Sequence, residues 1–266
     1  MRILSWLFGP NHAADPPKDA TPVVPPPSVP RAAGPQTVGC DPGDYYVSVG
    51  DPRFLDYPKQ EPLLRALTVD MLLAPHAELI RRIDYTLSFP GDGFERIVMP
   101  TIRRAAEYAN LIPASQSDHH CEPGGLLKHS LEAALFAAQL TDGMVFAGHE
   151  TPQRRRAIEP LWRFAAFVAS LLHDIGKAKE SVKATCPDGI HQWCPDRQPL
   201  TSWLRQHGIE AFRMTWDPDR RHKSHEKHSS ILCPEILGEA GRDYLLSVEN
   251  AGVYRALLEA LHGNAT

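Results

Sequence analysis

Residues 161–172 form a nearly continuous apolar run, Leu-Trp-Arg-Phe-Ala-Ala-Phe-Val-Ala-Ser-Leu-Leu. The run has the length of a helix rather than of a strand, and a helix that is apolar on nearly every side has to be buried. It leads directly into His173-Asp174 and then Ile-Gly-Lys177. The sequence therefore predicts a domain built around one central helix, which carries an imidazole and a carboxylate at its end.

From about Tyr57 onward, apolar residues recur at helical spacing along most of the chain. Further helices are predicted at residues 100–108, 126–140, 200–207, 225–240 and 253–262. Residues 182–193 instead hold a Pro-Asp-Gly turn between short segments that can alternate, which is a hairpin signal. We therefore predict a mainly α fold over residues 57–266, a helical bundle with a small β-hairpin insertion.

The first 56 residues have a different composition. Nine of the 25 prolines lie between Pro10 and Pro35, and proline fixes φ and lacks the amide donor that regular structure needs. We expect residues 1–56 to be a disordered tether. For its apolar start, residues 1–8, three interpretations stay open: a weak membrane contact, a segment that binds a partner protein, or a frayed terminus.

Charge and cysteine content narrow the class of protein. With a formal net charge of -4 no global positive field attracts nucleic acid, so any such contact relies on local basic patches. Five cysteines are an odd number without the spacing of a secreted disulfide framework. No apolar run approaches the roughly 20 residues that a membrane span needs. We expect a cytoplasmic protein, at most peripheral to the inner membrane.

The His173-Asp174 pair offers one nitrogen and one oxygen ligand, a mixture that suits Mn²⁺, Fe²⁺ or Zn²⁺. Alone, such a dipeptide is more often a satisfied histidine at a helix end. About forty residues earlier, however, the chain reads Gly-Gly-Leu-Leu-Lys-His129-Ser-Leu-Glu-Ala-Ala. The two segments together resemble the two leading motifs of the HD superfamily of metal-dependent phosphohydrolases.

This resemblance implies a divalent metal centre, with two ions of Mn, Fe, Mg or Zn. It carries metal ligation over to His129, His173, Asp174, His225 and His262, with His228 as the fallback for His225. The superfamily's closing aspartate would lie beyond His262, where the sequence given has four more residues. We expect that the chain is a fragment of a longer protein, or that the last ligand is missing or replaced.

A closer resemblance covers most of the predicted domain. It is carried by Leu-Ile-Pro113-Ala-Ser-Gln-Ser-Asp118-His119-His120-Cys-Glu-Pro-Gly-Gly-Leu-Leu-Lys-His129, by the His173 motif and by residues 216–225. These segments are similar to the MobH-type conjugative relaxases, which nick one DNA strand at the transfer origin of plasmids and integrative elements. Members of that family carry three successive histidines at this place, whereas this chain has Asp118 followed by two histidines, His119 and His120.

The relaxase resemblance implies DNA at the transfer origin as substrate, and the conjugation and type IV secretion coupling machinery as partners. Residues 57–266 would be the HD-type relaxase domain. Two other interpretations stay open: an HD phosphohydrolase that acts on nucleotides or a cyclic dinucleotide, and a non-catalytic DNA-binding module whose site is incomplete.

Several residues are candidates for catalysis beside Asp174. We expect His119 or His120 to lie near the metals or the scissile phosphate. Lys177 contacts phosphate or the leaving group, or caps helix carbonyls. Because strand transfer must be reversed, a covalent intermediate is favoured, and Tyr108 is the candidate nucleophile; alternatively Tyr108 packs against the core and a water activated by the metal cuts.

One basic cluster directly precedes His225 and is the best candidate for tracking a phosphate backbone. Aromatic side chains available to stack on bases lie elsewhere in the second half of the chain. The basic residues are Arg220, Arg221 and Lys223, and the aromatic ones are Trp193, Trp203 and Trp216.

Overall fold

The computed structural model describes Tyr45 and residues 63–117, 119–219 and 225–263, with only the backbone of His225. Helices dominate, and three short strands form one small antiparallel sheet, so the mainly α prediction is confirmed. The helices are α2 (Val69–Leu73), α3 (Ala77–Leu87), α4 (Met99–Ala109), α5 (Gly125–Leu140), α6 (Pro152–Leu172), α7 (Lys177–Glu180), α8 (Leu200–Gln206), α9 (His225–Leu246) and α10 (Val253–Leu261). The strands are β1 (Leu64–Arg65), β2 (Val182–Thr185) and β3 (Ala211–Trp216).

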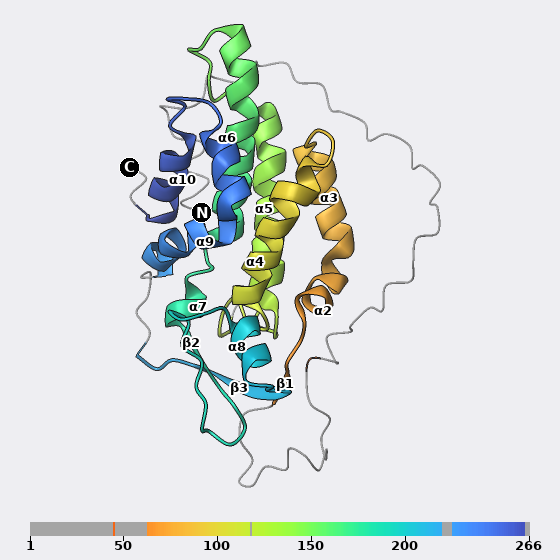
Figure 1. Cartoon of the computed structure of the whole chain (residues 1–266), viewed down its shortest axis with the longest axis vertical. Coiled ribbons are helices and arrows are strands. Elements are labelled where there is room, and N and C mark those ends of the chain that lie inside the picture. The colour runs from red at the N-terminus through yellow and green to blue at the C-terminus, as the bar shows by residue number, and fades with distance from the viewer. Residues whose placement is uncertain (1–44, 46–62, 118, 220–224, 264–266) are drawn as a thin grey trace, which may run out of the picture.

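Helices α5 and α6 run side by side through the middle of the molecule (Figure 1). Helices α9 and α10 pack against α6, α3 packs against α5, and α4 lies between α9 and α3 in this view, packed directly on α9. The strands gather with α7 and α8 at one end. Among the described residues, no helix combines the length and the apolarity that a membrane span requires.

Helix α6 is the buried centre that the apolar run predicted. Every residue from 164 to 169 has no exposed surface. The helix nevertheless begins nine residues before the run, because Thr151 accepts a hydrogen bond from the amide of Arg154 and Pro152 occupies the first turn. The early turns are polar and partly exposed, so the apolar pattern did not reveal them.

The sheet differs from the predicted hairpin. Strand β3 lies in the centre, pairing with β1 through Leu64 and Phe212 and with β2 through Val182 and Trp216. The returning arm of the Pro-Asp-Gly turn makes only one bridge, Thr185 with Gln192. The main partner of β2 therefore comes from the distant segment 211–216. That segment was missed because its first three residues are all buried, which removes the alternation of a half-exposed strand.

Tyr45 falls within the segment that was expected to be disordered, yet it is 6% exposed and belongs to the main core. Its ring lies beside Gly124, at the start of α5. The other residues of 1–56, including the apolar start 1–8, lie outside the described part of the chain. At least at this one position, the segment packs on the bundle.

Candidate metal centre

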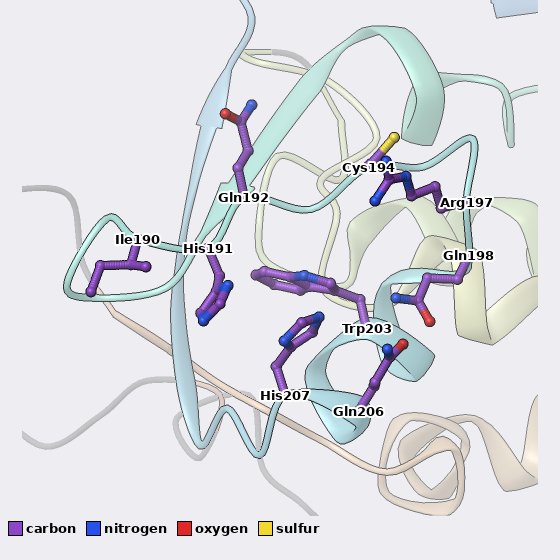
Figure 2. Close-up of a pocket in the computed structure, with 9 residues that line it drawn as sticks. All are labelled: Ile190, His191, Gln192, Cys194, Arg197, Gln198, Trp203, Gln206 and His207. Carbon is purple, nitrogen blue, oxygen red and sulfur yellow. The ribbon is translucent and has the colours of Figure 1, made fainter.

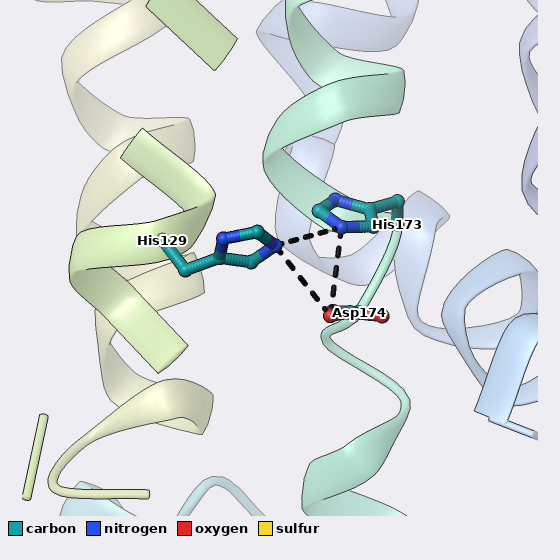
Figure 3. Close-up of side chains that lie close together, drawn as sticks. All are labelled: His129, His173 and Asp174. Carbon is teal, nitrogen blue, oxygen red and sulfur yellow. Dashed lines mark hydrogen bonds and ion pairs between the residues drawn. The ribbon is translucent and has the colours of Figure 1, made fainter. Parts of the chain in front are cut away.

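The site forms where the end of α6 meets the second turn of α5. His129 Nε2 lies 3.1 Å from His173 Nε2, and Asp174 Oδ2 lies 3.7 Å from the first nitrogen and 3.5 Å from the second (Figure 3). Close packing of α5 on α6 produces this meeting of residues 44 positions apart. The imidazoles of His129 and His173 therefore face a common point, as a shared metal ion requires.

These three atoms have the spacing of ligands around a single cation. A triangle with sides of 3.1, 3.5 and 3.7 Å has its corners about 2.0 Å from a common centre. That matches the roughly 2.0–2.2 Å bonds that nitrogen and carboxylate oxygen make to zinc and similar ions. Two imidazoles and one carboxylate are also a donor set used by divalent transition metals. The residues therefore fit such an ion.

The hydrogen bond of Nδ1 sets the tautomer of His173. Its Nδ1 lies 2.7 Å from the carbonyl oxygen of Ser170. Since a carbonyl only accepts, Nδ1 carries the proton and donates it. In the neutral ring Nε2 then presents its lone pair to the common point, as a metal ligand must.

His129 is biased toward the neutral form. Burial lowers its pKa, and the nearby His173 and Lys177 lower it further, while the carboxylate of Asp174 acts in the opposite direction. A neutral imidazole is the ligating form. The lowered pKa of His129 thus favours the form of this side chain that binds an ion.

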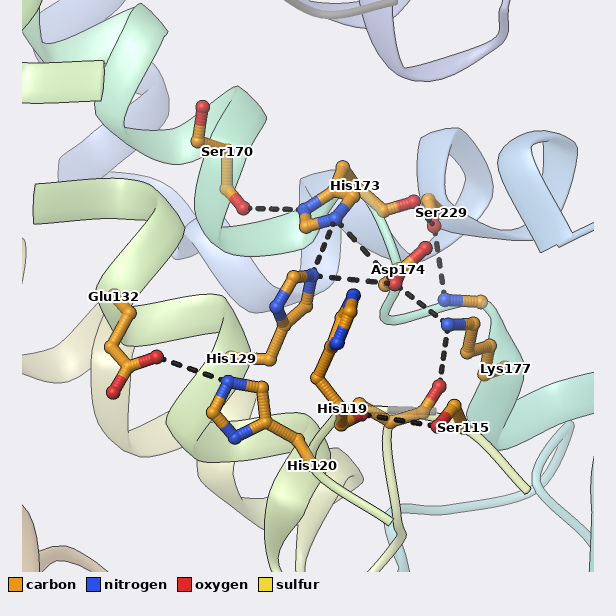
Figure 4. A network of polar contacts seen from close by, with 12 residues as sticks. Ser115, His119, His120, His129, Glu132, Ser170, His173, Asp174, Lys177 and Ser229 are labelled. Atoms are coloured by element: carbon orange, nitrogen blue, oxygen red, sulfur yellow. Dashed lines mark hydrogen bonds and ion pairs between the residues drawn. The ribbon is translucent and has the colours of Figure 1, made fainter. Parts of the chain in front are cut away.

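Lys177 links the carboxylate to a neighbouring loop. Its Nζ donates to Asp174 Oδ2 and to the carbonyl oxygen of Ala114, both at 2.7 Å. The ammonium therefore lies beside the same oxygen that faces the two imidazoles (Figure 4). Both roles expected of Lys177, a contact with phosphate and a helix-end cation, remain predictions.

Ser229 on α9 holds the turn that carries the pair. Its buried hydroxyl accepts from the amide of Gly176 at 2.9 Å and donates to the carbonyl of His173 at 3.0 Å. No pattern signals such a contact, because both partners are backbone atoms.

The loop before α5 brings both neighbouring histidines to the site. The carbonyl of His120 accepts from the amide of Ala114, and His120 adopts a positive φ of 57°. Its Nε2 lies 3.1 Å from Glu132 Oε2, a partner that the sequence did not indicate. The ring of His119 is directed instead toward the three candidate ligands (Figure 4).

A family model, TraI_2, described as "Putative helicase", matches residues 64–266. The chain belongs to the TraI_2 family. The membership supports a conjugative relaxase-type protein, the class to which the sequence motifs are similar. The match begins at β1, the first strand of the sheet. No curated protein matches the chain.

Tyr108 of this TraI_2 protein lies on α4 and is only 3% exposed. Its hydroxyl donates to Glu235 Oε1 at 2.9 Å, and burial together with this hydrogen bond raises the pKa of the phenol. A nucleophile needs an accessible, readily deprotonated oxygen. In this structure the phenol joins α4 to α9 through Glu235, and the nucleophile role of Tyr108 remains a prediction.

Two further predicted ligands lie apart from the three-residue group. His228 Nε2 is 3.9 Å from Glu180 Oε2, and the exposed His262 has its Nδ1 3.2 Å from Ser230 Oγ. Within the described ranges, His129, His173 and Asp174 are the one cluster of potential ligand atoms that lie within 4.8 Å of one another. The ligand roles of His228 and His262 remain predictions.

The rest of the predicted site falls where the structure gives no side chains. Arg220, Arg221 and Lys223 lie outside the described residues, and so does the side chain of His225. The backbone of His225 begins α9.

Proposed function

We propose that this chain is the HD-type domain of a MobH-type conjugative relaxase, which cleaves one phosphodiester at the transfer origin with the help of divalent metal. The single observation that carries the proposal is the convergence of His129, His173 and Asp174 within 4.8 Å. Membership of the TraI_2 family supports a substrate of DNA and partners in the conjugation machinery.

The three convergent side chains would hold a Mn, Fe, Mg or Zn ion. Such an ion supplies Lewis-acid polarisation of the scissile phosphate. A second ion would draw on His225, with His228 as its fallback, and on His262. Position 225 lies four residues before Ser229 on α9, so it shares the helix face that contacts the His173 turn. This favours His225 over His228.

Lys177 would bind the substrate. An ammonium has three N–H donors, and two of them already bond Asp174 and Ala114. The third would donate to a non-bridging oxygen of the phosphate. The ammonium would then oppose the negative charge that the phosphate gains as the bond breaks.

His119 would handle the proton. Its ring is directed toward the candidate ligands (Figure 4), and imidazole is the side chain that most often serves as a general acid or base in catalysis. We assign it the transfer of a proton from the attacking water or to the leaving oxygen. Because Tyr108 is buried, water is the nucleophile in this proposal.

The test is cleavage by the purified chain of a labelled single-stranded oligonucleotide carrying the transfer origin, with Mn²⁺, beside a panel of nucleotides. We expect cleavage at one position. His173→Ala and Asp174→Ala should abolish it and lower the bound metal measured by elemental analysis. His149→Ala is the matched control, since the His149 side chain is 81% exposed and lies beside Glu150.

Each alternative outcome contradicts the proposal in a distinct way. Turnover of a nucleotide without cleavage of the oligonucleotide would indicate a nucleotide phosphohydrolase. Binding of the oligonucleotide without any turnover would indicate a non-catalytic module. Unchanged metal content in both site variants would contradict the assignment of the metal centre.

A further inference from the structure

A pocket of about 520 Å³ lies at the sheet end of the molecule, between the loop that follows β2 and helix α8 (Figure 2). Its volume is within the range of roughly 300–1,000 Å³ that is typical of small-ligand sites. None of its lining residues belongs to the candidate metal centre. The pocket is therefore a separate feature that the proposed cleavage does not use.

Aromatic rings form the inner wall of the pocket. The ring centroids of His191 and His207 lie 4.8 Å apart. The ring centroid of Trp203 lies 6.1 Å from that of the His207 imidazole. Trp203 is only 3% exposed and belongs to the main core, so it provides a rigid floor. Flat π surfaces of this kind favour a planar, unsaturated ligand.

The rim carries groups that both donate and accept hydrogen bonds. Gln192, Gln198 and Gln206 present side-chain amides, and Arg197 presents a guanidinium (Figure 2). Within the described ranges, none of these four side chains forms a hydrogen bond. Amides match the mixed donors and acceptors on the edge of a nucleobase, and the guanidinium matches a phosphate.

The local charge also suits a phosphate. Asp196 is next to Arg197 in sequence, but its Oδ1 pairs with Lys179 Nζ at 2.7 Å. This ion pair neutralises the carboxylate and leaves the guanidinium as the cation of the rim. It also ties the pocket loop to α7, whose first residue, Lys177, contacts Asp174.

We propose that this pocket binds one unpaired nucleobase of single-stranded DNA, with Arg197 on its phosphate, and so holds the strand beside the cleavage site. The inference rests on the proposed function and specifies how the substrate is held. Stacking on the exposed imidazoles of His191 and His207 gives affinity for any base, and the three amides add a preference among bases. Because Lys179 of α7 holds Asp196 of the loop that lines the pocket, the pocket would take a nucleotide near the scissile phosphate.

The test measures binding of a short fluorescent single-stranded DNA to the full chain by anisotropy, in chelator so that no cleavage occurs. We expect His207→Ala to weaken binding by about 5- to 150-fold, the range for loss of one stacked base. Arg197→Ala should lower the slope of log affinity against log salt by about 0.7, as for one lost phosphate contact. Gln153→Ala, an exposed glutamine at the start of α6, is the matched control.

A scan with single abasic nucleotides gives the sharper readout. One abasic position should weaken binding to the wild-type chain, and the same substitution should have no further effect on His207→Ala. Equal sensitivity of both proteins at every position would overturn the proposal. Preferential capture of a free mononucleotide over the oligonucleotide, dependent on His207, would overturn the assignment to DNA.

The outcomes separate this inference from the proposed function. Because the binding assay contains no metal, the pocket can be confirmed even when the chain cleaves nothing. Conversely, specific cleavage that is indifferent to His207→Ala and to every abasic position would support the metal centre and reject the pocket.

Discussion

Ser229 should be the most sensitive non-ligand position of the candidate metal centre. Replacement by alanine removes the hydroxyl that joins the Gly176 amide and the His173 carbonyl, at 2.9 and 3.0 Å, and leaves both without that partner. Each unsatisfied buried group costs about 1–3 kcal/mol, so we expect Ser229→Ala to lower the free energy of unfolding by roughly 2–4 kcal/mol. At about 2–4 °C per kcal/mol, the melting temperature should fall by roughly 5–15 °C.

The assay is urea unfolding followed by tryptophan fluorescence, together with a Mn²⁺ titration of the folded protein. Without the two hydrogen bonds of the Ser229 hydroxyl, the turn that carries His173 can move. Metal affinity should therefore fall by about 10- to 100-fold, as for other groups that orient ligands. Ser247→Ala is the matched control, because Ser247 is exposed and directly follows the last residue of α9. Equal stability and equal metal affinity in the two variants would refute the reasoning.

Three further predictions follow from the geometry. Burial, and to a lesser extent nearby positive charge, lowers the pKa of His129 in the folded state. Below pH about 6.5 the unfolded chain therefore binds a proton at His129 that the folded chain excludes. In chelator, the free energy of unfolding should therefore fall as pH drops from about 6.5 toward the lowered pKa, and His129→Gln should flatten this slope in urea titrations. Gly125→Ala should cost about 1–3 kcal/mol in a denaturant melt, because the added Cβ would overlap the carbonyl oxygen of His120. The control Gly143→Ala meets open space and should change stability by less than about 0.5 kcal/mol. Tyr108→Phe should lose about 1 kcal/mol of stability with its hydrogen bond and cleave the origin oligonucleotide at the wild-type rate; abolished cleavage in a folded variant would restore it as the nucleophile.

The helical body was predictable because its signal is local. Apolar residues at helical spacing indicated α5 and α10 to within about a residue at each end, and the buried run indicated α6. The ends of longer helices were less predictable. Helix α9 continues to Leu246 through a break at Gly238, where Arg104 donates to the carbonyls of Ile236 and Leu237. That compensation comes from α4, so no pattern within the segment reveals it.

The sheet shows the limit of local patterns in the other direction. The Pro-Asp-Gly turn was visible in the sequence, but the stable partner of β2 is β3, which also pairs with β1. Strand pairing between distant segments depends on which surfaces the helices leave available. Such information is a property of the packed chain.

At the candidate site, the sequence determined the chemistry: two imidazoles, a carboxylate and a following lysine, on segments of helical character. Only the tertiary structure decided that α5 and α6 pack so that the two Nε2 atoms lie 3.1 Å apart. It alone also supplied the Ser229 hydroxyl and the carbonyls of Ser170 and Ala114. The physical reason is range. Helical periodicity and residue chemistry are written in neighbouring positions, whereas a distance between two helices results from the packing of the whole core, and backbone atoms carry no residue-specific signal.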